Sequence, residues 1–154
     1  MPIKSFQGRR SQPKKEELRP ALVSEFMTKK LITFKPEQPI AQVMEILIKN
    51  KISGGPVVNE NNELLGIISE GDCIKHISES RYHNLPGEID TVEKHMKTDV
   101  ETIDGNTNIF DAAKQFLSSR RRRFPILEKG KLVGQISQKD ILIAAMSQKG
   151  HNWK

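Results

Sequence analysis

Apolar positions along the chain change between a strand-like and a helix-like period, and they do so twice. The short aliphatic runs at 56–58 and 64–68 flank a polar turn at 59–62, which is typical of two paired strands. A stripe with helical spacing precedes them, formed by Ile40, Val43, Met44, Leu47 and Ile48. With a strand at 31–34 and a helix from about 70 to 80, the predicted order is strand, helix, strand, strand, helix.

The same order returns further along the chain. Met96 follows Met27 by 69 positions, and strands are predicted again at 100–103, 125–127 and 131–136. A helix is expected to start at Asn108, a good N-cap residue, and a last helix spans 138–147. The segments 66–72 and 134–140 share the pattern Gly-x-Ile-Ser-x-x-Asp, which indicates an internal repeat.

This repeat predicts a mixed α/β (α+β) fold in which two units pack about a pseudo-two-fold axis, because a unit of about 55 residues buries too little surface alone. The predicted boundaries are a basic disordered tail at 1–20, a first repeat at 21–80, a linker at 81–90, a second repeat at 91–148 and a C-terminal tail at 149–154. Two related clefts between the units are then expected, and such clefts are common ligand sites.

Composition limits the class of protein. Of the 154 residues 36% are hydrophobic and 29% charged, which suits a soluble globular protein, and no apolar run approaches the roughly 18 residues that cross a bilayer. Residues 1–20 are basic and polar without an apolar segment, so they are not expected to be a secretory signal, and one cysteine excludes an intramolecular disulfide. A cytoplasmic location without a membrane partner is expected.

The net charge of +6 is concentrated at one end. Residues 1–20 hold six Lys or Arg against two Glu, so they carry most of the excess. A solvated extension is the simplest interpretation of such a tail. Weak attraction to nucleic acid or to an anionic surface is the alternative.

The residues resemble those of the tandem CBS (cystathionine β-synthase) domain pair, from Val23 to about Ser147. The resemblance depends on the methionine that opens each repeat, on the Pro-Val-Val and Pro-Ile-Leu strands, on Thr33 and Thr102, and on the doubled Gly-x-Ile-Ser-x-x-Asp. It implies a stand-alone regulatory module that is not an enzyme, dimerises into a flat disc and signals to a separate effector protein.

The resemblance also implies an adenosine-containing ligand in the clefts. AMP, ADP or ATP is expected, while S-adenosylmethionine, NAD and dinucleotide messengers stay open. Two other classes remain: an interaction module that dimerises without ligand, and a nucleic-acid binder that uses the basic tail and Arg120–Arg123.

Ser69 and Asp72, and likewise Ser137 and Asp140, allow two interpretations. Either each pair is a capping box at a helix start, or the aspartate accepts hydrogen bonds from ribose hydroxyls while the serine meets phosphate, as the resemblance implies. A carboxylate has lone pairs enough for a cis-diol, and a helix start favours anions. Both aspartates turned into their own helix ends, together with a seam between the repeats packed solid by side chains, would rule out the second interpretation.

The other ligand-binding residues follow from the resemblance. It brings Thr33 and Thr102 close to adenine or ribose, although threonine is common in strands anyway. It also assigns base and phosphate contacts to two matching stretches, whose members are Ser53, Gly54, Gly55 and Pro56 in the first repeat and Arg122, Arg123, Phe124 and Pro125 in the second.

These two stretches differ in charge, which predicts unequal clefts. The glycines allow close backbone approach, whereas arginine suits phosphate. Four successive arginines at a helix end also have a simpler explanation, since cations are favoured near the last carbonyls. We expect the cleft with Asp140 and the arginines to prefer multiply charged ligands, and the cleft with Asp72 to be less charged and to bind weakly or not at all.

No other chemistry is indicated. Cys73 and His76 form half of a zinc-site pattern without a second half, so no metal site is predicted. No base suited to activating either serine is nearby in sequence, so no catalytic residue is predicted.

Overall fold

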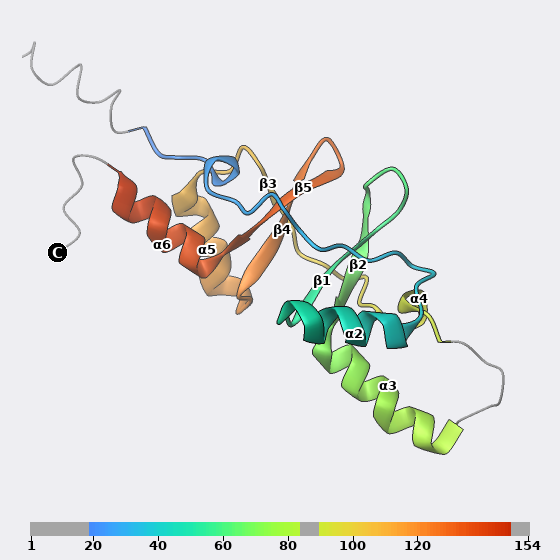
Figure 1. The fold of residues 1–154 in the computed structure, drawn as a ribbon. Helices are drawn as coiled ribbons and strands as arrows, with labels where there is room; N and C mark the ends of the chain where they lie inside the picture. Colours follow the sequence, from blue (N-terminus) through green and yellow to red (C-terminus); the bar gives the residue numbers. More distant parts are fainter. Residues whose placement is uncertain (1–18, 84–89, 149–154) are drawn as a thin grey trace, which may run out of the picture.

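The computed structural model describes residues 19–83 and 90–148, which form two α/β units (Figure 1). The first unit contains α2 (Ile40–Asn50), β1 (Gly54–Val58), β2 (Leu64–Ser69) and α3 (Glu70–His83). The second contains β3 (Ile103–Asp104), α5 (Ile109–Ser119), β4 (Arg123–Glu128), β5 (Lys131–Ser137) and α6 (Gln138–Ser147). The fold of two α/β repeats predicted from the sequence is confirmed.

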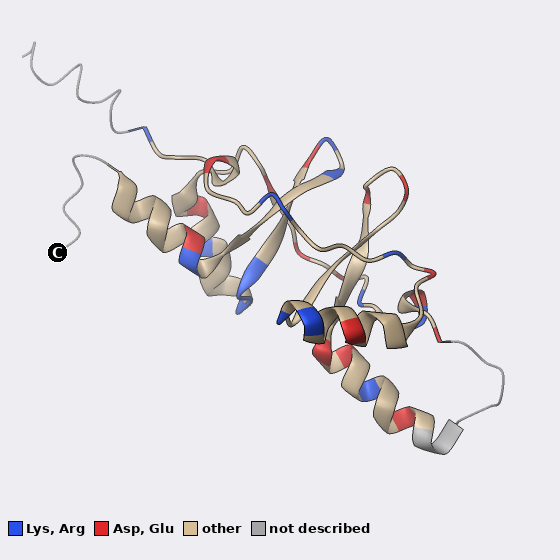
Figure 2. Cartoon of the chain, viewed as in Figure 1, with Lys and Arg blue, Asp and Glu red and all other residues tan. Residues whose placement is uncertain are grey.

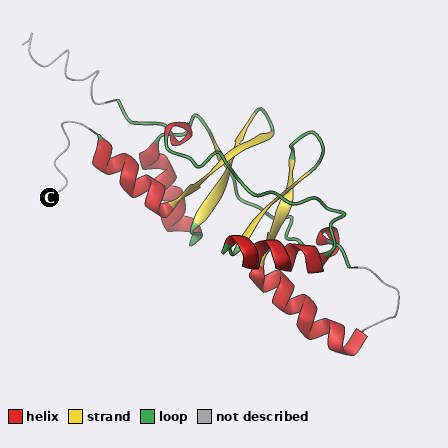
Figure 3. Cartoon of the chain, viewed as in Figure 1, coloured by secondary structure: helices red, strands yellow, loops and turns green. Residues whose placement is uncertain are grey.

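The two sheets are small and nearly equivalent. β1 pairs with β2 in antiparallel fashion, while β4 pairs with β5 in antiparallel fashion and with β3 in parallel. The strand predicted at 31–34 is reduced to one parallel bridge between Phe34 and Val57, and the strand predicted at 100–103 begins only at Ile103. In each unit the helices lie together on one side of the strands (Figure 3).

The starts of α5 and α2 show how well short sequence patterns predict where a helix begins. Asn108 is the N-cap of α5, and its side-chain oxygen accepts from the backbone N–H groups of Phe110 and Asp111 at 3.0 and 2.9 Å. The prediction for that helix start is therefore confirmed. Proline is common at the first helical position, but Pro39 is instead the N-cap of α2, with an extended ψ of 143°.

The segment that opens each repeat packs in the other unit. η2 (Val23–Glu25) is a short 3-10 helix, and Val23 is fully buried in the core of the second unit. Its N–H donates to the carbonyl of Thr107 at 2.8 Å, and Thr28 bridges Gln135 on β5. The first repeat thus donates its opening residues to the second unit.

The opening segment of the second repeat, α4 (Val92–His95), packs in turn against the first unit. Val92 is fully buried in the core of the first unit, and its N–H donates to the carbonyl of Gln38 at 2.9 Å. Lys97 bridges Ile67 on β2. The exchange is reciprocal, so neither unit has a complete core without the other repeat.

At two pairs of equivalent core positions, the two repeats carry side chains of different size. Phe34 and Gly55 in the first unit correspond to Ile103 and Phe124 in the second, 69 positions later. A Cβ on Gly55 would lie 2.9 Å from the Phe34 ring and 2.8 Å from the carbonyl oxygen of Ile32. Close-packed cores tolerate little extra volume. The large side chain therefore comes from Phe34, next to β1, in the first unit and from Phe124, on β4, in the second.

The two hairpins also touch at their turns. Leu132 donates its N–H to the carbonyl of Asn62 at 3.0 Å and accepts from the Asn62 side chain at 2.7 Å. Lys131 Nζ donates to the carbonyl of Asn61 at 2.7 Å. These bonds fix how the units sit relative to each other.

Among the described residues, no helix is both long and apolar enough to cross a membrane.

Candidate ligand site

The Ser69–Asp72 pair forms a capping box at the start of α3. Asp72 Oδ2 accepts from the backbone N–H of Ser69 at 2.9 Å and from its hydroxyl at 3.0 Å. The Asp72 N–H lies 3.4 Å from Ser69 Oγ in return. Asp72 is only 7% exposed, so these bonds offset the cost of burying its carboxylate.

The second repeat has the same device. Asp140 Oδ2 accepts from the Ser137 N–H at 2.9 Å, and Ser137 Oγ accepts from the Asp140 N–H at 3.2 Å. The capping interpretation made from the sequence is thus confirmed for both pairs. In both aspartates the bonds fall on Oδ2, and Oδ1 takes no part in them.

The hairpin brings two of the predicted site residues of the first repeat next to this box. Gly54 pairs with Ser69 in the register of the hairpin, and the Ser53 carbonyl accepts from the Glu70 N–H at 2.8 Å. Thr33 is half-buried beside Phe34, whose N–H donates to the Pro56 carbonyl at 2.9 Å. Ser53 and Gly54 therefore lie at the start of α3, while Thr33 belongs to the segment along the other edge of β1.

The close approach at the glycines is made by the protein itself. Gly55 accommodates the Phe34 ring, and a Cβ on Gly54 would lie 2.6 Å from the Ile68 carbonyl oxygen. The interpretation that these glycines make room for a ligand is not needed to explain them.

The second repeat repeats the arrangement with arginine in place of glycine. Arg123 pairs with Ser137, and the Arg122 carbonyl accepts from the Gln138 N–H at 3.2 Å. Both arginines are exposed, whereas Phe124 and Pro125 are buried. The Phe124 ring is 4.7 Å from that of Phe116, so its side chain belongs to the core and only its backbone is left for a ligand.

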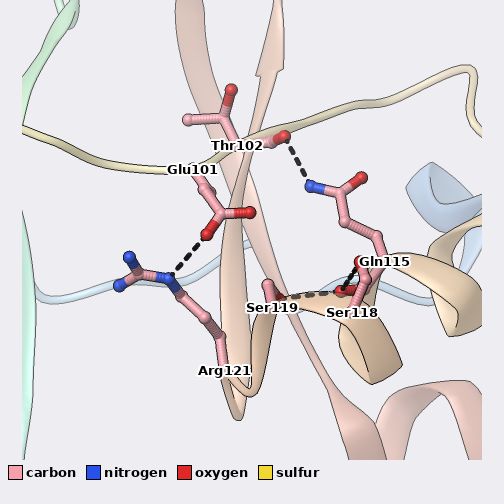
Figure 4. A network of polar contacts seen from close by, with 6 residues as sticks. All are labelled: Glu101, Thr102, Gln115, Ser118, Ser119 and Arg121. Carbon is pink, nitrogen blue, oxygen red and sulfur yellow. Dashed lines mark hydrogen bonds and ion pairs between the residues drawn. The ribbon is translucent and has the colours of Figure 1, made fainter.

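The arginine run is divided by its neighbours. Arg120 ends α5 in the left-handed conformation, with φ 60°. Arg121 Nε pairs with Glu101 Oε1 at 3.1 Å (Figure 4). The sequence analysis missed this pair, because a separation of twenty positions outside a helix carries no periodic signal. It leaves Arg122 and Arg123 as the predicted phosphate ligands.

Thr102 lies in the same network. Its carbonyl accepts from Gln115 Nε2 at 3.2 Å, and the Gln115 carbonyl accepts from the hydroxyls of Ser118 and Ser119 at 3.2 and 2.7 Å (Figure 4). The segment that carries Thr102 is thereby fastened to α5, and the Thr102 side chain is half-buried.

Charge differs between the two helix starts. α3 begins with Glu70 and Asp72, while α6 begins with Asp140 next to exposed Lys139 and the arginine run (Figure 2). Burial raises the pKa of the Cys73 thiol above 9.0, and the charges of Asp72 and Glu70 add to this. The first site is the more acidic of the two.

A separate hollow of about 320 Å³ lies at the turn of the first hairpin. Its lining is polar and comes from 35–37 and 59–61. None of the predicted site residues lines it, so it is not the predicted cleft.

Comparison with known proteins identifies the class. The CBS domain family model matches residues 23–79 and 89–147, more than half of the chain. The chain therefore belongs to the CBS domain family and carries two copies of the domain in tandem, as the resemblance implied.

Particular relatives fit this class. The chain is 32% identical over 153 residues to the chloroplastic CBS domain-containing protein CBSX1 of Arabidopsis thaliana, which covers 82% of this chain and 65% of CBSX1. The chain thus spans less than two thirds of that relative's length.

Two solved structures share the fold. One is CBSX2 in complex with AMP, with 26% identity, a TM-score of 0.68 and coverage of 81% of this chain and 96% of that one. The other is the CBS domain pair of MJ0100 in complex with 5-methylthioadenosine and S-adenosyl-L-methionine, with 25% identity, a TM-score of 0.65 and coverage of 80% and 98%.

Proposed function

We propose that this chain is a regulatory module, without catalytic activity of its own, that binds an adenine nucleotide between its two repeats. The observation that carries the proposal is the position of Asp72 and Asp140. Each is held by its own helix end through Oδ2, and Oδ1 remains an acceptor near the hairpin residues that pair with the capping serine. A fixed carboxylate with one acceptor oxygen left suits a ribose hydroxyl.

The relatives support the ligand class. CBSX2 is described in complex with AMP, and MJ0100 with two other adenosine compounds. The shared chemistry is adenosine, so AMP, ADP and ATP are the first candidates, with S-adenosylmethionine and NAD next.

We further propose that the two sites differ. Arg122 and Arg123 give the second site cations that the first lacks, since Gly54 stands where Arg123 stands in the repeat. Phosphate groups should therefore add more affinity at the second site.

The signal would pass through the joined units. Because each repeat completes the core of the other, a ligand that binds one relative position of the units more tightly shifts the equilibrium toward it. A separate effector protein would sense that shift. A cytoplasmic location remains a prediction.

A homodimer is part of the proposal. Large apolar side chains are exposed on the helices, which is costly unless another surface covers them. They are Ile48 on α2, Ile74 and Ile77 on α3, Phe110 and Leu117 on α5, and Leu142, Ile143 and Met146 on α6.

The second candidate function is an interaction module without ligand. The capping boxes favour it, because they give both Ser-x-x-Asp motifs a structural role that needs no nucleotide.

Thermal denaturation with AMP, ADP, ATP, S-adenosylmethionine and NAD separates the two candidates. A ligand at 100 times its dissociation constant stabilises the fold by about 2.7 kcal/mol. For a domain of this size that raises the melting temperature by roughly 5 to 11 °C. No shift with any of the five compounds would favour the interaction module.

A further inference from the structure

One polar cluster lies away from the Ser-x-x-Asp motifs. His76 on α3, Asp90 before α4 and His95 at the end of α4 come together where the two repeats exchange their elements. The described residues contain one such group of three potential metal ligands, with all ligand atoms within 4.8 Å of one another.

The cluster is centred on one carboxylate oxygen. Asp90 Oδ2 is 2.9 Å from His76 Nδ1 and 3.3 Å from His95 Nε2. The imidazole rings meet edge to face, with centroids 4.9 Å apart. Lys94 lies on the other oxygen, with Nζ 3.9 Å from Asp90 Oδ1. Both imidazoles therefore face the same oxygen.

One nitrogen in the cluster lacks a hydrogen bond. His95 Nε2 is buried and has no hydrogen-bond partner, although the Asp90 oxygen is at ion-pair distance. A buried polar atom without a partner is costly and calls for an explanation. A bound metal ion would explain the unpaired nitrogen, because the ion accepts the lone pair of the imidazole directly.

We propose that His76 Nδ1, His95 Nε2 and Asp90 Oδ2 form a binding site for a divalent transition-metal ion of the zinc class. Two imidazoles and one carboxylate are donors that suit zinc, cobalt or nickel better than magnesium or calcium. In a tetrahedral zinc site with bonds of about 2.0–2.1 Å, neighbouring donor atoms are about 3.3 Å apart. The two distances from the imidazoles to Asp90 Oδ2 are already close to that value, and the ligand atoms of the three residues all lie within 4.8 Å of one another.

The surroundings allow an ion to enter and be held. The side chains of His76 and His95 are 20% and 15% exposed, and that of Asp90 is 31% exposed. Three protein ligands leave one position of a tetrahedral ion for water. Cys73 is not part of the site, since its side chain is buried in the core of the first unit.

Such an ion would join α3 to the exchanged helix α4. Those two helices already pack together, and Val92 of α4 is buried in the core of the first unit. Bound metal would therefore strengthen the attachment of the second repeat's opening segment. This inference is independent of the proposed nucleotide function.

The test uses the full chain after treatment with a chelator. Equilibrium dialysis against zinc should give one bound ion per chain, and cobalt should give the visible absorption of a tetrahedral complex without a thiolate charge-transfer band. Changes in the outer shell alone weaken metal sites by about 10- to 100-fold, so His76→Gln and His95→Gln should each weaken zinc binding at least tenfold. Asp99→Asn, which removes an exposed carboxylate four positions after His95 in the sequence, should bind as the natural sequence does.

Two results would overturn the inference without depending on how the variants fold. One is less than stoichiometric zinc on the natural chain, and the other is a cobalt spectrum of the natural chain that shows a thiolate charge-transfer band. Undiminished zinc affinity in a folded His95→Gln variant would also overturn it.

Discussion

Gly134 on β5 packs against the side chain of Met27, although 107 positions separate them in the chain. A Cβ on Gly134 would be 2.5 Å from Met27 Sδ and 2.9 Å from the Thr28 carbonyl oxygen. Gly66 stands in the same relation to Met96 and Lys97, at 3.0 and 2.6 Å. The glycine that opens each Gly-x-Ile-Ser motif therefore serves the exchange of opening segments between the repeats.

Gly134→Ala is expected to destabilise the fold by about 1–3 kcal/mol, the usual cost of excess volume in a packed site. The backbone carbonyl of Thr28 cannot move aside without breaking its bridge to Gln135. Urea denaturation measures the change in the free energy of unfolding. Gly71→Ala is the control, because its added Cβ would lie 3.6 Å from the nearest atom, in ordinary contact. Equal stability of the two variants would contradict this role for Gly134.

Arg123→Ala should weaken ATP binding by about tenfold, corresponding to about 1.4 kcal/mol, and AMP binding by less. The reason is that added phosphates gain most from an exposed guanidinium next to the start of α6. Calorimetric titration with both nucleotides measures the ratio. Arg121→Ala is the matched control, since Arg121 is already paired with Glu101. A loss of the same size in both variants would mean that only general charge matters.

Cys73 gives a pH-dependent prediction. Because its pKa is raised above 9.0 in the fold, its stabilising contribution is fully present below pH 9.0 and is lost as the pH rises through the folded value. The free energy of unfolding should fall more steeply above pH 9 in the natural chain than in Cys73→Ala. Iodoacetamide should also modify the native thiol slowly and the urea-unfolded thiol quickly. Parallel pH profiles of the two proteins would refute the assignment.

Leu142→Glu should shift the chain from dimer to monomer. Leu142 is 66% exposed on α6 beside Ile143 and Met146, so an added charge would disturb any surface that covers them. Sedimentation velocity measures the state. Lys114→Glu, an exposed change on α5, should leave the dimer intact. A natural chain that is monomeric at all concentrations would remove the dimer from the account.

The features that depend on neighbouring residues were predictable from the sequence. The hairpins, the two capping boxes and the start of α5 follow from short patterns such as Asn108 before an apolar stripe. What the sequence did not show depends on distant partners. No local signal tells that Val23 is buried in the second unit and Val92 in the first.

The candidate site divides in the same way. Its residue types were visible in the repeat, but their side-chain directions were not. Phe124 enters the core because Ile103 leaves space for it, and Arg121 is bound by Glu101. The cluster of His76, Asp90 and His95 was missed because the exchange of α4 brings it together.

The central claim is that each aspartate presents Oδ1 to a ribose while Oδ2 caps its helix. Asp72→Asn and Asp140→Asn test this claim. The amide oxygen of asparagine can still cap the helix, whereas its amide nitrogen puts a hydrogen-bond donor where the acceptor Oδ1 faced the ligand. Ser69→Ala and Ser137→Ala are the converse controls, which weaken the cap by about 1 kcal/mol and keep the acceptor.

The most direct measurement is calorimetric titration of AMP into the natural chain and into the double variant Asp72→Asn/Asp140→Asn. We predict saturable binding to the natural chain, loss of at least tenfold in affinity in the double variant, and melting temperatures that stay within a few degrees of each other without ligand. Equal AMP affinity in both proteins, or no heat of binding in either, would contradict the account.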